Sequence, residues 1–536
     1  MRILFVNLLL ISSCYSGKAQ TWNWAKGFGG PGVDLIASMK INAEEEIYFS
    51  GTYHETIDLG TTILEALQGS DAFLSKSDNQ GNVLWAVSAG SLNNDFSLDI
   101  EVDKEGNILW LGQYWVAAFF ENDTIQAGSN AKAYFVAKYN PEGQLIWAKS
   151  INGSSTKVVN DLTLDAANNI YLTGYFRDSL IVDDIILTSQ ATEDAFVLKI
   201  AADGDPSWGV QYGNSGTTRP QKIETTSNGQ LVIAGNFTGS VTFGDNDLVS
   251  VTTDFDIFIA LLDENGIASW GRIGTGVFDN LVNALAIDAN DNIYVSGNFT
   301  GVLGIDNQSI STPGFNSNLY LLKLNASGDL AWARGLDDQV FNDPSFSYDI
   351  ALKDGLVLMT GQFLGTLLLD DLQLLGEASE FKGYIASFDS VDGKVKKLSL
   401  IPGTAQTSGS RIAVDSDGRL YLGGTFSDQV TLGNTTLTSS GNLDFFIAQA
   451  SPTFTGVGNV ILKKNSISIS PNPVSENLYL NTLDQTFLVA VFDLYGRQVL
   501  VAKNQASLDV RWLAPGNYFI RYASAGYVQI LPFVKM

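Results

Sequence analysis

Short runs of alternating polar and apolar residues fill most of the chain, and turns rich in Asn, Asp and Gly separate them. Between residues 161 and 212 four such runs follow one another, at 161–165, 170–176, 195–200 and 207–212. Alternation with a period of two, together with many β-branched and aromatic residues, is typical of antiparallel strands. No segment keeps the 3.6-residue period of an amphipathic helix. The pattern therefore predicts an all-β protein.

The four-strand unit recurs with a period of about 62 residues. Six tryptophans in its last run are 61 or 62 residues apart, at Trp24, Trp85, Trp147, Trp208, Trp270 and Trp332. A Gly-x-aromatic marker recurs seven times in step with them, from Gly51-Thr-Tyr53 to Gly424-Thr-Phe426. A fixed period of this length predicts a repeat architecture.

The two ends of the repeated region complement each other. A lone fourth strand, 22–27, precedes the first complete unit, whereas the last unit supplies three strands, at 411–414, 420–426 and 445–450. If the N-terminal strand completes the last unit, the region 20–455 forms a closed seven-bladed β-propeller of four-stranded blades. The tryptophans are then expected to pack between neighbouring blades.

Local motifs add a family resemblance. Asn-Ile-Tyr at 169–171 and 292–294, and Gly-Asn-Phe-Thr-Gly at 235–239 and 297–301, resemble the SBBP-type β-propeller repeats of secreted bacterial proteins. The Gly-x-x-x-Trp step is also similar to quinone-dehydrogenase propellers. Those proteins need a quinone, Ca²⁺ and usually eight blades, so seven repeats without a recognisable quinone site argue against that relation.

The last 70 or so residues change character, with short strands and turn signals typical of a small β-sandwich. We expect a linker at 456–465 and a domain at 466–536. This segment resembles the type A C-terminal sorting domain of the type IX secretion system of Bacteroidota. The resemblance implies export by that machinery, and its motif residues are Pro471, Asn472, Pro473, Asp493, Gly496, Arg497, Gly516, Tyr518 and Lys535.

The first residues have the pattern of a secretory signal. Arg2 precedes an apolar run, 3–11, and small residues follow up to a cleavage site after Ala19. A lipoprotein signal at Cys14 is the alternative. No other apolar run approaches the roughly 20 residues of a membrane-spanning helix. The sequence predicts a secreted or outer-surface protein.

Composition excludes several kinds of chemistry. The net charge of −26 argues against nucleic-acid binding, because phosphates would be repelled. With one cysteine, Cys14, and one histidine, His54, the chain cannot build a structural zinc site or a disulfide framework. We therefore assign no catalytic residue, no metal ligand and no cofactor. Calcium is considered only at the Asp-rich turns 288–292 and 415–418, which lack the EF-hand pattern.

Candidate binding residues come from the loops. Each unit has a long connection between its second and third strands, which we expect to form a hairpin; seven hairpins would crown one face around the channel. The acidic candidates on this face are Asp34, Asp95, Asp161, Asp279 and Asp343. The alternative is that they are solvated turn residues needed for backbone geometry.

Three functions stay open. The first is a non-enzymatic scaffold that binds a glycan or a protein through the hairpin face. The second is a polysaccharide- or peptide-degrading enzyme with carboxylates at the channel mouth. The third is a purely structural surface module. The similarity of the repeats favours binding, because an active site normally makes one unit irregular.

Overall fold

The computed structural model describes residues 20–536 except 122, 128–131, 155, 313–316, 337–343, 378, 452–460, 463–467, 482–486, 495 and 525–526. The expected signal sequence with Cys14, the site residue Asp343 and most of the expected linker lie outside the described residues. The described residues form strands and no helix, which confirms the all-β prediction.

Seven sheets share one strand order, in which the first, second, third and fourth strands of a repeat lie side by side and antiparallel. We number them sheets 1 to 7 by their first strands: β2 (Leu35–Ile41), β6 (Phe96–Val102), β12 (Lys157–Leu164), β18 (Ser215–Thr225), β23 (Leu281–Ile287), β29 (Ser345–Lys353) and β35 (Thr407–Val414). The second strands are β3 (Ile47–Asp58), β7 (Ile108–Trp115), β13 (Ile170–Phe176), β19 (Leu231–Phe243), β24 (Ile293–Phe299), β30 (Leu356–Phe363) and β36 (Leu420–Phe426).

The third strands are β4 (Ile63–Ser77), β10 (Lys132–Tyr139), β16 (Asp194–Ile200), β21 (Asp256–Leu262), β27 (Asn318–Leu324), β33 (Lys382–Asp389) and β39 (Asp444–Ala450). The fourth strands of sheets 1 to 6 are β5 (Val83–Ala89), β11 (Leu145–Gly153), β17 (Pro206–Tyr212), β22 (Ala268–Gly276), β28 (Leu330–Gly335) and β34 (Val395–Ile401). In sheet 7 the fourth position is taken by β1 (Trp22–Phe28), which pairs with β39 from Trp22–Ala450 to Phe28–Phe445.

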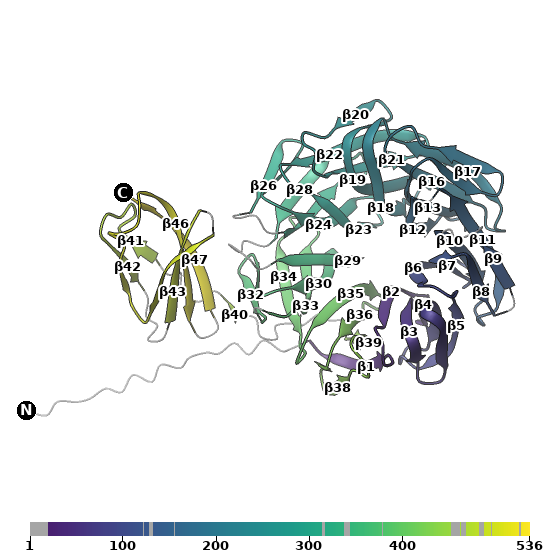
Figure 1. Cartoon of the computed structure of the whole chain (residues 1–536), viewed down its shortest axis with the longest axis horizontal. Helices are drawn as coiled ribbons and strands as arrows, with labels where there is room; N and C mark the ends of the chain where they lie inside the picture. The colour runs from purple at the N-terminus through teal and green to yellow at the C-terminus, as the bar shows by residue number, and fades with distance from the viewer. Residues whose placement is uncertain are drawn as a thin grey trace, which may run out of the picture.

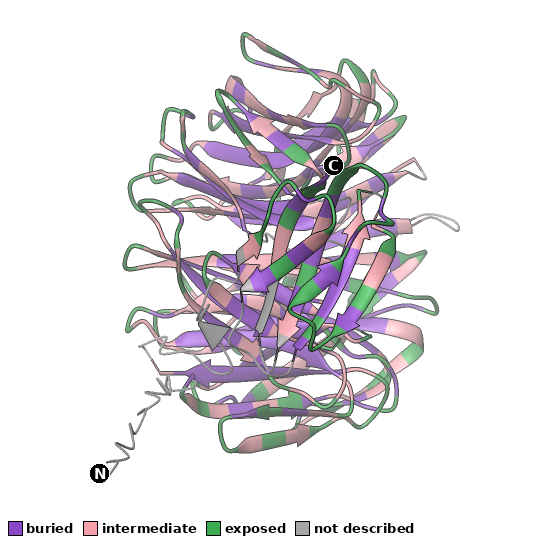
Figure 2. Cartoon of the chain, turned by 90° about the vertical axis from the view of Figure 1, so that its left-hand side faces the viewer, coloured by how far each residue is buried: buried purple, intermediate pink, exposed green. Residues whose placement is uncertain are grey.

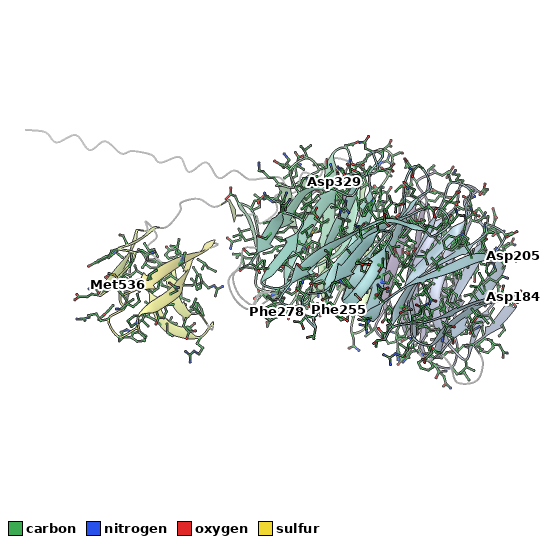
Figure 3. The ribbon with its side chains drawn as sticks, turned by 90° about the horizontal axis from the view of Figure 1, so that it is seen from above. Asp184, Asp205, Phe255, Phe278, Asp329 and Met536 are labelled. Atoms are coloured by element: carbon green, nitrogen blue, oxygen red, sulfur yellow. The ribbon has the colours of Figure 1, made fainter. Side chains whose placement is uncertain are left out.

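The sheets stand radially around a common centre, with the first strands innermost (Figure 1). First strands of consecutive sheets contact one another, and β35 contacts β2. The connections lie on two opposite faces. Figure 3 shows Phe255 and Phe278, which precede the third strand of sheet 4 and the first strand of sheet 5, on one face, and Asp329, between the third and fourth strands of sheet 5, on the other.

The apolar cores lie between the sheets. Each of seven clusters of buried residues takes its members from two consecutive sheets, and one of them joins Phe445 and Ile447 of sheet 7 to Phe49 and Phe73 of sheet 1. Buried residues accordingly concentrate in the strands and exposed ones in the connections (Figure 2). Stability therefore depends on how well neighbouring sheets fit together.

The repeated tryptophans pack between neighbouring sheets, as the sequence predicts. Each lies against a glycine in the turn two residues before the fourth strand of the next sheet, so that a Cβ built on Gly143 would be 2.7 Å from the Trp85 ring. The same contact joins Trp24 to Gly81, Trp147 to Gly204, Trp208 to Gly266, Trp270 to Gly328 and Trp332 to Gly393. All six glycines have positive φ, which a residue with a side chain rarely adopts.

The hairpins between second and third strands do not crown the channel, and that prediction is wrong. They lie at the periphery (Figure 1), where β14 of sheet 3 pairs with β11 of sheet 2, and β25 of sheet 5 pairs with β22 of sheet 4. A fourth strand is a sheet edge with unpaired backbone groups, and the hairpin of the next repeat continues its ladder. The separate hairpin strands are β8 (Ala117–Phe120), β9 (Asp123–Gln126), β14 (Ser179–Val182), β15 (Ile185–Thr188), β20 (Asn246–Val249), β25 (Val302–Ile305), β26 (Gln308–Ser311), β31 (Thr366–Leu369), β32 (Leu372–Leu375), β37 (Gln429–Leu432) and β38 (Thr435–Thr438).

The C-terminal region forms two further sheets around one apolar core. One contains β41 (Ser468–Ser470), β42 (Asn477–Asn481) and β45 (Ser507–Asp509), and the other contains β44 (Gln498–Lys503), β43 (Phe487–Asp493), β46 (Gly516–Ser524) and β47 (Tyr527–Lys535). The buried side chains of both sheets form a single cluster. A two-residue strand, β40 (Ile461–Leu462), precedes them and pairs with β32.

The contact between tryptophan and glycine yields a prediction. Gly143→Ala should lower the free energy of unfolding by about 1–3 kcal/mol more than Gly229→Ala, because a methyl group at 143 collides with Trp85. Gly229 is the matched control: its φ of 81° is close to the 80° of Gly143, and nothing lies within 4 Å of its added Cβ. Urea unfolding of both variants measures the difference. Equal losses would show that the contact between sheets contributes nothing.

Candidate functional site

Every first strand has one β-bulge, at the same place in each repeat. The extra residue that faces no partner on the second strand is Ala37, Leu98, Asn160, Gln221, Asn283, Tyr348 or Ser410. The residue before the bulge pairs with the glycine of the Gly-x-aromatic marker, as Ile36 pairs with Gly51. A Cβ on Gly51 would lie 2.0 Å from the carbonyl oxygen of Leu35, so only glycine fits there.

Behind the bulges, two layers of side chains line the channel that the first strands enclose. Residues two apart on a strand face the same side. The layer next to the bulges contains Ser38, Asp99, Asp161, Lys222, Ala284, Asp349 and Arg411, and the following layer contains Lys40, Glu101, Thr163, Glu224, Ala286, Ala351 and Ala413. Three cations therefore share this channel with five carboxylic acids.

Many of these groups join one sheet to the next. Asp99 Oδ2 accepts a hydrogen bond from the backbone N–H of Leu162 at 3.3 Å, and Asp349 Oδ2 accepts one from Ile412 at 2.9 Å. Asp161 makes the same contact with Ile223 at 2.8 Å and forms an ion pair with Lys222 at 2.6 Å. These N–H groups follow the bulges. The channel carboxylates therefore satisfy backbone donors of neighbouring sheets.

Enclosure by protein shifts the protonation of the channel acids. Burial raises the pKa of Asp161 to about 7 and that of Glu224 to about 8, although Lys222 and Lys40 oppose the shift. Burial also raises the pKa values of Glu101 and Asp349. Burial alone would lower the pKa of Lys40, but the field of Glu101 and neighbouring carboxylates outweighs it and raises that pKa. Lys40 is therefore charged, while Asp161 and Glu224 are partly protonated at neutral pH.

A pocket of about 240 Å³ opens beside the bulges. Its wall comes from five of the seven first strands and contains Asn160, Gln221, Lys222, Val282, Asn283, Tyr348 and Arg411. Four of these seven, three amides and one tyrosine, are bulge residues. The bulges thus turn polar side chains toward a shared cavity, as bulges next to binding sites often do. A second cavity, of about 350 Å³, lies between sheets 7 and 1 and includes Lys26, Asn82 and Thr438.

The structure gives the predicted acidic residues different positions. Asp34 and Asp95 are fully buried and hold loop backbone: Asp34 accepts from Gly30 N at 2.6 Å and His54 N at 3.2 Å, and Asp95 accepts from Trp115 N at 3.0 Å. Both carboxylates are therefore turned inward, away from any external ligand. Burial raises the pKa of each to about 6.

Asp161 belongs to a first strand and faces the channel, not the loop face on which the sequence placed it. Asp279 is exposed on that face and accepts a hydrogen bond from Phe255 N at 2.9 Å. The charged channel residues other than Asp161 were missed. The signal was present, because Ser38 and Asp99, or Lys40 and Glu101, are 61 residues apart and occupy equivalent repeat positions.

The turns considered for calcium have their oxygens engaged. Asp288 Oδ1 accepts from the N–H groups of Asn290 and Asn292 at 2.9 Å, and its Oδ2 accepts from the Tyr294 hydroxyl at 3.2 Å. Asp415 binds Arg419 and the Tyr421 hydroxyl in the same way. Across the described part of the chain, no group of three or more His, Cys, Asp or Glu residues is placed to hold a metal ion.

The C-terminal motif residues build the turns of their domain. Asp493 accepts from Arg497 N at 3.0 Å and Arg497 Nε at 2.7 Å, around Gly496, whose φ is 73°. The Asn472 side chain, between Pro471 and Pro473, bonds Pro532 O and Val534 N at 3.2 and 2.9 Å. These motif residues therefore stabilise the local backbone of the domain.

The remaining motif residues lie at one end of the second sheet. The Tyr518 ring stacks on Phe533 with 5.5 Å between centroids, and Gly516 pairs with the buried Lys535.

Comparison with known families decides the nature of this region. Residues 468–535 match the family described as the secretion system C-terminal sorting domain. This region is a sorting domain. Its presence indicates export to the cell surface or the medium. No helix in the described part of the chain has the length and apolar character needed to cross a membrane.

The chain also has a distant relative. It is 22% identical to an uncharacterized WD repeat-containing protein, L264, of Acanthamoeba polyphaga mimivirus, over 75% of this chain and 36% of that protein. The chain thus spans about a third of the relative's length.

Two solved structures are also similar. A quinohemoprotein alcohol dehydrogenase from Comamonas testosteroni is 9% identical, with 85% of this chain and 79% of that chain covered and a TM-score of 0.36. A europium-containing methanol dehydrogenase is 10% identical, with 80% and 93% covered and a TM-score of 0.36.

A buried acid on the third strand of sheet 1, Asp71, predicts how the free energy of unfolding depends on pH. Asp71 is 2% exposed, its Oδ2 accepts from Leu67 N at 3.0 Å, and burial raises its pKa to about 7. Because the folded state then holds a proton that the unfolded state releases near pH 4, unfolding becomes easier as the pH rises from 4 to 7. Asn318 occupies the equivalent position in sheet 5, so the repeat tolerates an amide there.

We expect Asp71→Asn to raise the free energy of unfolding by about 2 kcal/mol at pH 8 and to change it little at pH 4. Denaturant unfolding across this range measures both values. Asp78→Asn is the control, because Asp78 is in an exposed turn and its pKa is lowered by its hydrogen bonds with Asn82 despite some burial. An equal effect of Asp71→Asn at both pH values would contradict the assignment.

Proposed function

We propose that the protein is an extracellular binding scaffold, exported by the type IX secretion system of a bacterium of the Bacteroidota. In this proposal residues 1–19 are removed as a signal peptide, 20–455 form a seven-bladed propeller closed by the N-terminal strand, and 466–536 are the sorting domain. The ligand is a glycan or a protein. The observation that carries the proposal is a sorting domain joined to a ring of sheets with a polar pocket at its centre.

The ring supports binding because it is rigid where ligands would approach. First strands are tied to their neighbours by side-chain bonds such as Asn283 Nδ2 to Ser347 O, at 2.9 Å. Loops on a rigid scaffold are the usual place for recognition. At the mouth of the channel, Leu35, Phe96 and Leu281, each the first residue of a first strand, are 38–39% exposed. These side chains offer apolar contacts around the polar pocket.

An enzyme is the second candidate, because acids from several sheets meet in the channel with raised pKa values. Hydrolysis of a glycoside needs one acid to protonate the leaving group and an opposed, ionised carboxylate that is free to act. Three of the five acids, Asp99, Asp161 and Asp349, already hold backbone N–H groups of the next sheet. Glu101 is paired with Lys40. This structural use of the acids favours binding over hydrolysis.

Export is tested by removing the sorting domain. We expect deletion of residues 468–536 to leave the protein in the periplasm, because the machinery then has no signal to recognise. Cell fractionation and immunoblotting measure this. As a control, residues 452–536 attached to a periplasmic reporter should carry it outside. Normal secretion of the truncated protein would refute the export route.

Binding is tested on glycan and peptide arrays with the purified secreted protein. We expect saturable binding to one ligand class, with product release absent over hours. Release of shortened products would contradict the binding-scaffold proposal and support the enzyme. Binding to neither array would leave the structural module as the better account.

A further inference from the structure

We propose that the pocket beside the bulges binds one neutral sugar ring, such as the terminal residue of a glycan. This inference rests on the proposed binding function and gives it a site and a ligand class. The pocket has seven wall residues from sheets 3 to 7: Asn160, Gln221, Lys222, Val282, Asn283, Tyr348 and Arg411.

The size of the pocket points to a small ligand. Its volume of about 240 Å³ is below the roughly 300–1,000 Å³ of pockets that enclose drug-sized molecules. A single six-membered ring with its hydroxyl groups suits this space. A peptide segment or a folded partner does not, although either can extend from the pocket over the loop face.

The hydrogen-bonding groups of the wall are both donors and acceptors. Asn160 Nδ2 donates to Pro220 O at 2.6 Å, and Asn283 Nδ2 donates to Ser347 O at 2.9 Å. These bonds fix the orientation of both amides, because only the nitrogen can donate to a carbonyl. Their Oδ1 atoms are thereby left as acceptors, and within the described residues neither has a hydrogen-bond donor.

Two further groups complete the set. Gln221 uses Nε2 in a long contact of 3.4 Å with Arg219 O, so its oxygen is another available acceptor. Arg411 donates through Nε to Ala37 O and through one terminal nitrogen to Ser410 O. Its other terminal nitrogen makes no hydrogen bond with the described residues. Sugar hydroxyls, which both donate and accept, match such a mixture.

The charges of the wall favour a neutral ligand. Lys222 is paired with Asp161 at 2.6 Å, and Arg411 lies in the field of Asp349, whose pKa it lowers against the larger effect of burial. A ligand carboxylate would therefore meet Asp161 and Asp349, and a ligand ammonium would meet Lys222 and Arg411. Hydroxyl groups avoid both conflicts.

The wall also offers apolar surface for the carbon face of a sugar ring. Tyr348 and Val282 line the pocket, and Leu281 at the channel mouth is 39% exposed. The other five wall residues are polar or charged, so the apolar groups form one part of the contact surface and the hydrogen-bonding groups the rest. Tyr348 is half-buried, so its ring is available without a rearrangement of the strand.

The test uses ligand-observed saturation-transfer NMR on the full secreted protein. The neutral probes are glucose, galactose, mannose and xylose, and the charged probes are glucuronate and glucosamine. We expect saturable binding of at least one neutral sugar. Gln221→Ala and Tyr348→Ala should each raise its dissociation constant at least threefold, because the first removes a hydrogen-bonding group and the second removes the ring that faces the sugar.

Thr438→Ala is the matched control, since Thr438 belongs to the cavity between sheets 7 and 1 and not to the channel. It should leave sugar binding unchanged. Binding of charged probes alone, loss of binding in the Thr438 variant only, or no neutral sugar bound would each overturn the proposal. Array binding of a peptide that the channel variants do not weaken would overturn the sugar site while leaving the scaffold function intact.

Discussion

The contact between consecutive sheets is the interaction on which the rest of the structure depends. No sheet has a core of its own, since each apolar cluster of the ring is shared by two neighbours. A tryptophan of one sheet against a positive-φ glycine of the next sets the distance between them at six junctions. Close packing of this kind leaves little room for substitution, because interiors respond to a single added methyl group.

The bulges are the second constraint, and they connect packing to chemistry. Each bulge brings a first-strand carbonyl close to the neighbouring strand, which excludes any Cβ at the marker glycine. It also leaves backbone groups without a partner on the second strand, and in four of the seven sheets the bulge residue is a polar one that lines the central pocket. Carboxylates and amides from adjacent sheets then satisfy those groups, as Asp161 does for Ile223. The polar channel is therefore a consequence of how the innermost strands are tied together.

The sequence was sufficient to predict the features that repeat along the chain. It was not sufficient to predict features that depend on which segments become neighbours in the folded structure. The period, the strand order and the role of the tryptophans follow from spacing alone. The place of the hairpins does not, because β14 pairs with β11 of the preceding repeat and no local pattern encodes that partner. Asp34 and Asp95 resemble solvated turn acids in sequence, yet both are buried by loops from elsewhere. The channel charges fall at two repeat positions, and aligning the repeats would have revealed them although the residues at each position differ in sign.

The pairing of β1 with β39 has a consequence for the order in which this protein can mature. Trp22 faces Ala450, so the two partners are separated by almost the whole ring. A contact this distant in sequence forms late, since the entropy cost of closing a long loop comes before the favourable pairing of the two strands. A chain emerging from a ribosome or a translocation pore therefore holds an incomplete last sheet until residue 450 is free. The sorting domain follows soon after that point, so it is synthesised only after every strand of the ring.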